Sequence, residues 1–90
     1  MINYAVWNDS DMENVDKKEM IGRLKERGLR ITPQRLAVVD ALLDNYHEHP
    51  GAMMIYHEAR KKAPHISLST VYATLKEFSE KGLIRQLEFD

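Results

Sequence analysis

Residues 66–82 read ISLSTVYATLKEFSEKG, and this stretch decides the fold. Its apolar residues recur at steps of three and four, which places them on one face of a helix. They are Leu68, Val71, Leu75 and Phe78. Ser67 precedes the pattern as a candidate N-cap, and Gly82 follows it as a stop signal. The stretch therefore predicts an amphipathic helix with an apolar back.

The opposite face of this helix carries short polar or weakly basic side chains. At about 100° per residue they are Ser69, Ala73 and Lys76, with Tyr72 flanking them. A small-residue front lets a helix approach base edges in a DNA major groove, while the apolar back holds it in the domain. An ordinary amphipathic helix with a solvated face gives the same pattern, so this stretch alone leaves both interpretations open.

Size and composition indicate one small soluble domain. The 90 residues are 43% apolar and 30% charged, and no run approaches the roughly 18 apolar residues of a membrane span. The first ten residues lack the basic and apolar regions of a secretory signal, so we expect a cytoplasmic protein with no membrane partner. The absence of cysteine excludes disulfides, thiolate nucleophiles and cysteine zinc sites from these residues.

The net charge of −1 hides a separation of charges along the chain. Residues 1–16 hold four acidic residues and no basic one, whereas residues 17–38 hold seven basic residues against two acidic ones. The basic residues are Lys17, Lys18, Arg23, Lys25, Arg27, Arg30 and Arg35. A basic half beside an acidic arm favours a polyanion partner, although a solvated charged face would look the same.

The chain divides into an acidic N-terminal arm, residues 1–16, and a domain, residues 17–90. The arm shows no periodicity, and we expect it to be ordered only if its aromatic residues find a groove. Further helices are predicted at residues 16–27, 33–45 and 52–62. Asp16 and Thr32 are their candidate N-caps, with Pro33 at the first helical position.

Residues 83–90, LIRQLEFD, predict a strand, which needs a partner. Helix, short turn and helix, followed by a strand, is the order of a winged helix, in which a hairpin directly after the strand supplies that partner. We therefore expect a mainly α fold with a small β wing, a winged helix-turn-helix, truncated after the first strand of the wing. The chain is then expected to be a piece of a longer protein.

Some polar residues suggest ligands. Arg35 lies in the first turn of its helix, where a cation opposes the helix dipole, so an external anion such as phosphate would suit it, although a solvated arginine is equally open. His47 and His49 could bind a metal, but loop histidines are more often solvated. With His57 and His65 they make a weak case for an enzyme or a stand-alone metal protein, because the chain has no glycine-rich phosphate loop and no HExxH motif. We expect no catalytic residues.

Four blocks carry a resemblance to a known family. GLRITPQR (28–35), HPGAMMIY (49–56), ISLSTVYATL (66–75) and KGLIRQLEF (81–89) occur in an order and spacing similar to those of the N-terminal DNA-binding domain of the ferric uptake regulator family. TPQR and the His-Pro pair resemble its peroxide-stress branch most. The resemblance covers residues 17–90, and it implies a metal- or peroxide-responsive, dimeric transcriptional repressor that reads DNA with a winged helix.

The resemblance also implies site residues. Tyr72 would touch thymine methyls and backbone in the major groove, where Ser69 and Thr70 would contact phosphates or base edges. Arg30 would enter the adjacent minor groove, and Arg35 would anchor the DNA backbone. Lys76 completes the predicted DNA-binding set together with Ala73, at a position where many family members carry Arg or Asn. Because Ala73 cannot hydrogen-bond a base, readout would depend more on DNA shape and thymine contacts, in double-stranded DNA with an A·T-rich inverted repeat.

Metal binding and dimerisation are implied only for a longer chain. His49 resembles the one metal ligand that this domain lends to a regulatory site for iron, manganese or zinc; the other ligands and the homodimer interface would lie in a C-terminal domain absent here. One histidine cannot hold a divalent ion, so we expect no cofactor in these 90 residues. The alternative function is a winged-helix protein-interaction module that does not bind DNA.

Overall fold

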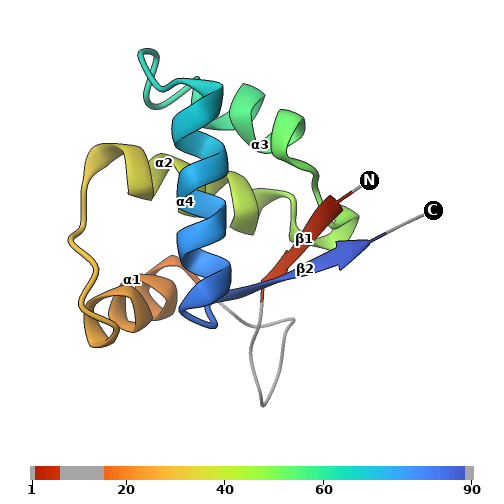
Figure 1. Cartoon of the computed structure of the whole chain (residues 1–90). Coiled ribbons are helices and arrows are strands. Elements are labelled where there is room, and N and C mark those ends of the chain that lie inside the picture. The colour runs from red at the N-terminus through yellow and green to blue at the C-terminus, as the bar shows by residue number, and fades with distance from the viewer. Residues whose placement is uncertain (1, 7–15, 89–90) are drawn as a thin grey trace.

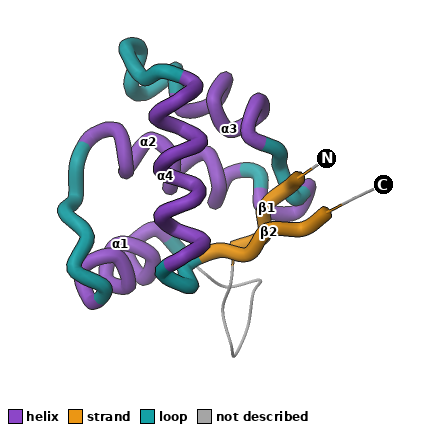
Figure 2. Tube along the Cα trace, in the orientation of Figure 1, coloured by secondary structure: helices purple, strands orange, loops and turns teal. Residues whose placement is uncertain are grey.

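Helix α4 (Leu68–Glu80) runs through the middle of the fold, with the other helices packed behind and beside it (Figure 1). The computed structural model describes residues 2–6 and 16–88. Within them the elements are β1 (Ile2–Val6), α1 (Lys17–Glu26), α2 (Pro33–Asp44), the short 3₁₀ helix η2 (Tyr46–Glu48), α3 (Ala52–Ala59), α4 and β2 (Ile84–Glu88). Four helices with a two-stranded sheet at one side confirm the predicted winged-helix class (Figure 2).

The predicted helix starts are confirmed by their caps. In each case the cap side chain accepts the backbone N–H three residues on: Asp16 from Glu19 at 2.8 Å, Thr32 from Arg35 at 3.1 Å and Ser67 from Thr70 at 3.1 Å. These bonds satisfy N–H groups that have no partner within the helix, which is why short polar residues begin all three.

The apolar face of α4 forms the centre of the core. Val71, Leu75 and Phe78 are fully buried and belong to one core cluster with residues of α1, α2 and α3. The fully buried partners include Met20, Leu24, Val38, Val39, Leu42 and Ile55. Burial of this face fixes which side of α4 remains available to a ligand.

One acidic residue of α2 ties the other helices together. The Asp40 carboxylate forms ion pairs with Lys17 Nζ of α1 at 3.2 Å and with Lys62 Nζ, beyond α3, at 3.0 Å. The chain already turns at residues 60–62, so α3 ends at Ala59 and the prediction that it reaches residue 62 is wrong. Pro64 prevents the helix from continuing beyond this turn, because a proline disfavours helical backbone in the residue before it.

The N-terminal residues overturn part of the predicted arm. Residues 2–6 form strand β1, which pairs antiparallel with β2 in the register Ile2↔Glu88 to Val6↔Ile84. Tyr4, Ala5 and Val6 are buried, and that burial stabilises a segment too short to reveal itself by periodicity. The rest of the predicted acidic arm lies outside the described residues, including Trp7, Asp9, Asp11 and Glu13.

The predicted strand after residue 82 is confirmed as β2, but its observed partner differs from the expected hairpin. β1 lies along β2, and on its other side Asn3 bridges Gly51, while the Tyr4 N–H donates to the Pro50 carbonyl at 2.9 Å. β1 therefore lies between β2 and the segment that leads into α3 (Figure 1). Phe89, placed in the predicted strand, lies outside the described residues.

Candidate nucleic-acid interface

The face of α4 opposite the core is exposed, as its sequence predicts. Ser69, Tyr72, Ala73 and Lys76 all lie on this surface, and Tyr72 is 51% exposed. Ser69 and Ala73 are small and Lys76 is the one cation on this surface. The backbone of the N-terminal half of α4 can therefore approach a partner closely.

The start of α4 is held by two hydroxyl groups. Ser67 Oγ accepts the Thr70 N–H and donates to Thr70 Oγ1 at 2.9 Å. Thr70 is half-buried and its hydroxyl already has a partner, whereas Ser69 is exposed. Of these two predicted contact residues, Ser69 is therefore the better placed to reach an external group.

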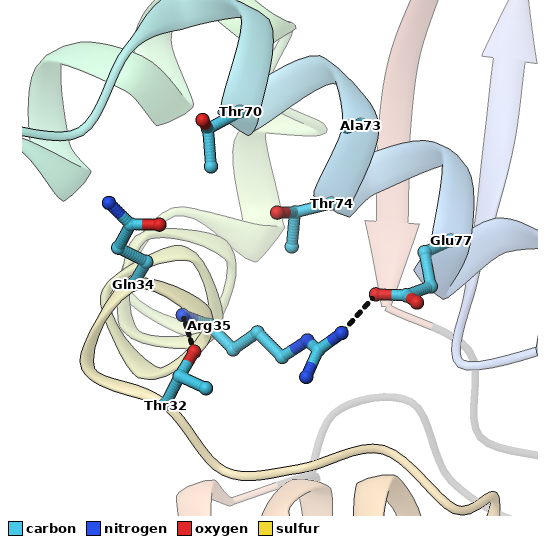
Figure 3. Close-up of a pocket in the computed structure, with 7 residues that line it drawn as sticks. All are labelled: Thr32, Gln34, Arg35, Thr70, Ala73, Thr74 and Glu77. Carbon is cyan, nitrogen blue, oxygen red and sulfur yellow. Dashed lines mark hydrogen bonds and ion pairs between the residues drawn. The ribbon is translucent and has the colours of Figure 1, made fainter.

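A polar hollow of about 410 Å³ separates the first turn of α2 from α4. Figure 3 shows the residues that line it: Thr32, Gln34, Arg35, Thr70, Ala73, Thr74 and Glu77. Sequence reasoning singled out Arg35, Thr70 and Ala73 but missed Gln34, an exposed side chain directly before Arg35. Its position in the first turn of a capped helix is the signal that could have found it.

The two predicted DNA-contacting arginines differ in their surroundings. Arg30 is exposed, and its guanidinium bonds no other described residue. Arg35 instead donates from Nη1 to the Arg30 carbonyl at 2.9 Å and from Nη2 to Glu77 Oε1 at 2.9 Å (Figure 3). Arg30 can therefore reach outward, while Arg35 joins the connector before α2 to α4.

A second, apolar hollow of about 720 Å³ lies on the other side of Tyr72, where β1, α3 and α4 meet. Its lining has no charged side chain and includes Asn3, Tyr4, Gly51, Ala52, Gln86 and four large apolar residues. Those four, Ile2, Met53, Met54 and Tyr72, are all the large hydrophobic side chains exposed in the described part of the chain. The apolar hollow thus concentrates exposed apolar surface beside the predicted reading residue.

Tyr4 of β1 lies under this surface. Burial raises the pKa of its phenol above the ordinary value of 10.0, and the nearby Tyr72 phenol raises it further. Tyr4 and Tyr72 line the same apolar hollow, so β1 lies next to Tyr72. Sequence reasoning missed this, because nothing in residues 1–6 points to α4.

The histidines do not gather into a metal centre. Among the described residues no three His, Asp or Glu side chains lie close enough together to hold a metal ion. His49 is exposed and has left-handed backbone (φ 48°), while His57 and His65 are exposed elsewhere. The side chain of His47 lies outside the described part of the structure. The described residues therefore do not fit a complete divalent-metal site.

Four packed helices, of which α4 presents an exposed polar face beside a small sheet, define a winged helix-turn-helix protein. The profile of the Ferric uptake regulator family matches residues 26–90, so the chain belongs to that family. It corresponds to the family's N-terminal region, and the family consists of regulators and not enzymes. β1 lies outside the matched region.

Peroxide regulators are among the curated proteins whose sequences are similar to this chain. The chain is 37% identical over 82 residues to the peroxide-responsive repressor PerR of Staphylococcus epidermidis, covering 89% of this chain and 54% of the relative. It is 44% identical over 72 residues to the peroxide operon regulator of Bacillus subtilis, covering 80% and 49%. The chain thus spans about half the length of these curated relatives. No helix among the described residues is long and apolar enough to cross a membrane.

Proposed function

We propose that this chain is the DNA-reading domain of a metal- or peroxide-responsive transcriptional repressor. The observation that carries the proposal is the exposed face of α4, with small side chains, an aromatic residue and one cation, held on a fully buried apolar back. Membership of the ferric uptake regulator family and the names of the PerR relatives support it.

The contacts follow from the placement of the side chains. Ser69, Tyr72 and Lys76 would face the major groove, with Ala73 allowing close approach and Thr70 holding the start of the helix. Arg30 would extend into the adjacent minor groove, where a narrow A·T-rich groove attracts a cation. The proposed ligand is double-stranded DNA with an A·T-rich inverted repeat. Each half of the repeat would be bound by one subunit of a two-fold symmetric dimer.

Metal response and stable dimerisation are proposed for a longer protein. His49 would supply one of the four to six ligands that a divalent iron, manganese or zinc ion needs, and the described residues offer no group of three or more such ligands. Residues beyond the described ones would have to complete the site.

The test is fluorescence anisotropy on an A·T-rich inverted-repeat duplex and on a scrambled duplex of the same composition, over a salt series. We expect a steep fall in affinity with salt, because phosphate contacts release counterions. Tyr72→Ala should lower the affinity for the repeat by about 1–3 kcal/mol, the usual cost of losing a base-contacting side chain. Unchanged affinity and preference in Tyr72→Ala would remove α4 as the reader.

The apolar hollow favours a second candidate, a winged-helix module that binds protein. A lining without charge that exposes Ile2, Met53 and Met54 resembles the core of a protein interface more than a phosphate-binding surface. Weak binding that is equal for both duplexes and insensitive to salt would support this candidate over DNA reading.

A further inference from the structure

Two arginines bond helix α4, Arg27 from the segment before α2 and Arg35 from the first turn of α2. Arg27 donates from Nε to the Lys81 carbonyl at 2.6 Å, at the C-terminal end of α4. Arg35 donates to Glu77 Oε1, one turn earlier on α4, and also to the Arg30 carbonyl, both at 2.9 Å. Arg30 lies between these two arginines in the chain, so its backbone is held against α4 from both sides.

Arg35 is badly placed to act as an exposed phosphate anchor. Its side chain is 24% exposed, and both terminal guanidinium nitrogens already donate to groups within the protein. These bonds use two of the five guanidinium N–H groups, and the remaining ones belong to a side chain that its neighbours largely cover. Figure 3 shows the guanidinium directed along the edge of the polar hollow towards Glu77.

The link to Arg30 gives these bonds a consequence for recognition. A single planar guanidinium fixes the connector carbonyl and the α4 carboxylate together, which a flexible point charge could not do. The distance between the Arg30 side chain and the exposed face of α4 then depends on Arg35. Elements held in their binding geometry before the ligand arrives lose less conformational entropy on binding.

We propose that Arg35 and Glu77 form a positioning pair that sets the spacing between Arg30 and the reading face of α4, and thereby the sequence preference for DNA, without touching DNA. The inference rests on the proposed DNA-reading function. Arg35 then differs in role from the phosphate anchor expected from the sequence. Glu77, an acidic residue beside the proposed DNA surface, then serves to hold Arg35 in place.

The variants separate positioning from phosphate contact. Glu77→Ala removes the partner of Arg35, and Glu80→Ala removes the same charge from an exposed position on the same helix as the matched control. Arg35→Lys keeps a cation that could still hold a phosphate but lacks the planar fork whose two terminal nitrogens bond the Arg30 carbonyl and Glu77 separately. The salt slope of each variant counts the phosphate contacts that are lost.

We expect Glu77→Ala and Arg35→Lys each to reduce the preference for the inverted repeat over the scrambled duplex by about five- to tenfold, with an unchanged salt slope. Because loss of a carboxylate by itself favours DNA binding, Glu80→Ala should bind both duplexes slightly more tightly and keep the preference. The double variant Arg35→Ala/Glu77→Ala should lose little more preference than Arg35→Ala alone, as interacting partners do.

The opposite pattern would overturn the proposal. If Glu77→Ala behaved like Glu80→Ala, and Arg35→Ala lowered the salt slope by about one while Arg35→Lys restored it, then Arg35 would be a phosphate anchor. Partly exposed ion pairs contribute about 0–1 kcal/mol to stability, so these variants should remain folded, which thermal unfolding checks. Failure of DNA reading itself would appear separately, as absence of any preference in the unchanged chain and no effect of Tyr72→Ala.

Discussion

Strand β1 gives the sharpest test of the fold, because sequence reasoning expects an arm where the structure has a docked strand. Val6 is 3% exposed and belongs to the core. Val6→Ala removes two buried methyl groups, worth about 0.8 kcal/mol each in transfer from water, and leaves a cavity that adds to the cost. The expected loss in the free energy of unfolding is about 2 kcal/mol. For a domain of this size the Tm should fall by about 8–16 °C.

Ile2→Ala is the matched control for Val6→Ala. Ile2 lies on the same face of the same strand but is 42% exposed, so truncation there should change the free energy of unfolding by less than about 0.5 kcal/mol. Thermal and urea unfolding, followed by far-UV circular dichroism, measure both variants. Equal, small effects of the two substitutions would refute the docking of β1 and return residues 2–6 to the status of a loose arm.

Three further predictions concern backbone, pH and metal. Gly22→Ala should stabilise the chain by about 0.5–1 kcal/mol, because Gly22 lies within α1 with open space around it, whereas Gly28→Ala should destabilise it by about 1 kcal/mol, because φ there is +77°; shifts of the same sign in urea unfolding would contradict this. The raised pKa of buried Tyr4 means that the unfolded chain loses this proton first as the pH rises, so the stability that Tyr4 contributes is present below about pH 10 and is lost as the pH climbs towards its folded pKa. Tyr4→Phe should therefore show a smaller loss of stability above pH 10 than the unchanged chain. Calorimetry with zinc or manganese should detect no tight site in the 90 residues and no difference in His49→Ala, while a stoichiometric, tight site lost in that variant would place a complete metal centre here.

The parts of the fold that depend on neighbouring residues could be predicted well. Capping bonds join residues three apart, so Asp16, Thr32 and Ser67 mark the helix starts in the sequence itself. The same holds for the two faces of α4, because a helical period converts sequence spacing directly into direction. The end of α3 was predicted three residues late, since the balance between a last helical turn and a tight turn before Pro64 is small.

The candidate site divides in the same way. The exposure of Ser69, Tyr72, Ala73 and Lys76 follows from the helical period, and the family resemblance of the surrounding blocks is confirmed by the family profile. Their roles in DNA contact remain predictions. Arg35 was recognised as an unusual cation, but its partner lies 42 residues away, and no local pattern reveals such a pair.

The sequence by itself determined the helices, their caps, the buried and exposed faces of α4 and the family. These features are set by backbone hydrogen bonding and by side-chain periodicity within a few residues. Only the tertiary structure decided that residues 2–6 pair with β2, that Arg35 joins Arg30 to Glu77, and that Ile2, Met53, Met54 and Tyr72 share one apolar hollow. These contacts join segments far apart in the chain, and each exists only because burial of the common core brings its two sides together.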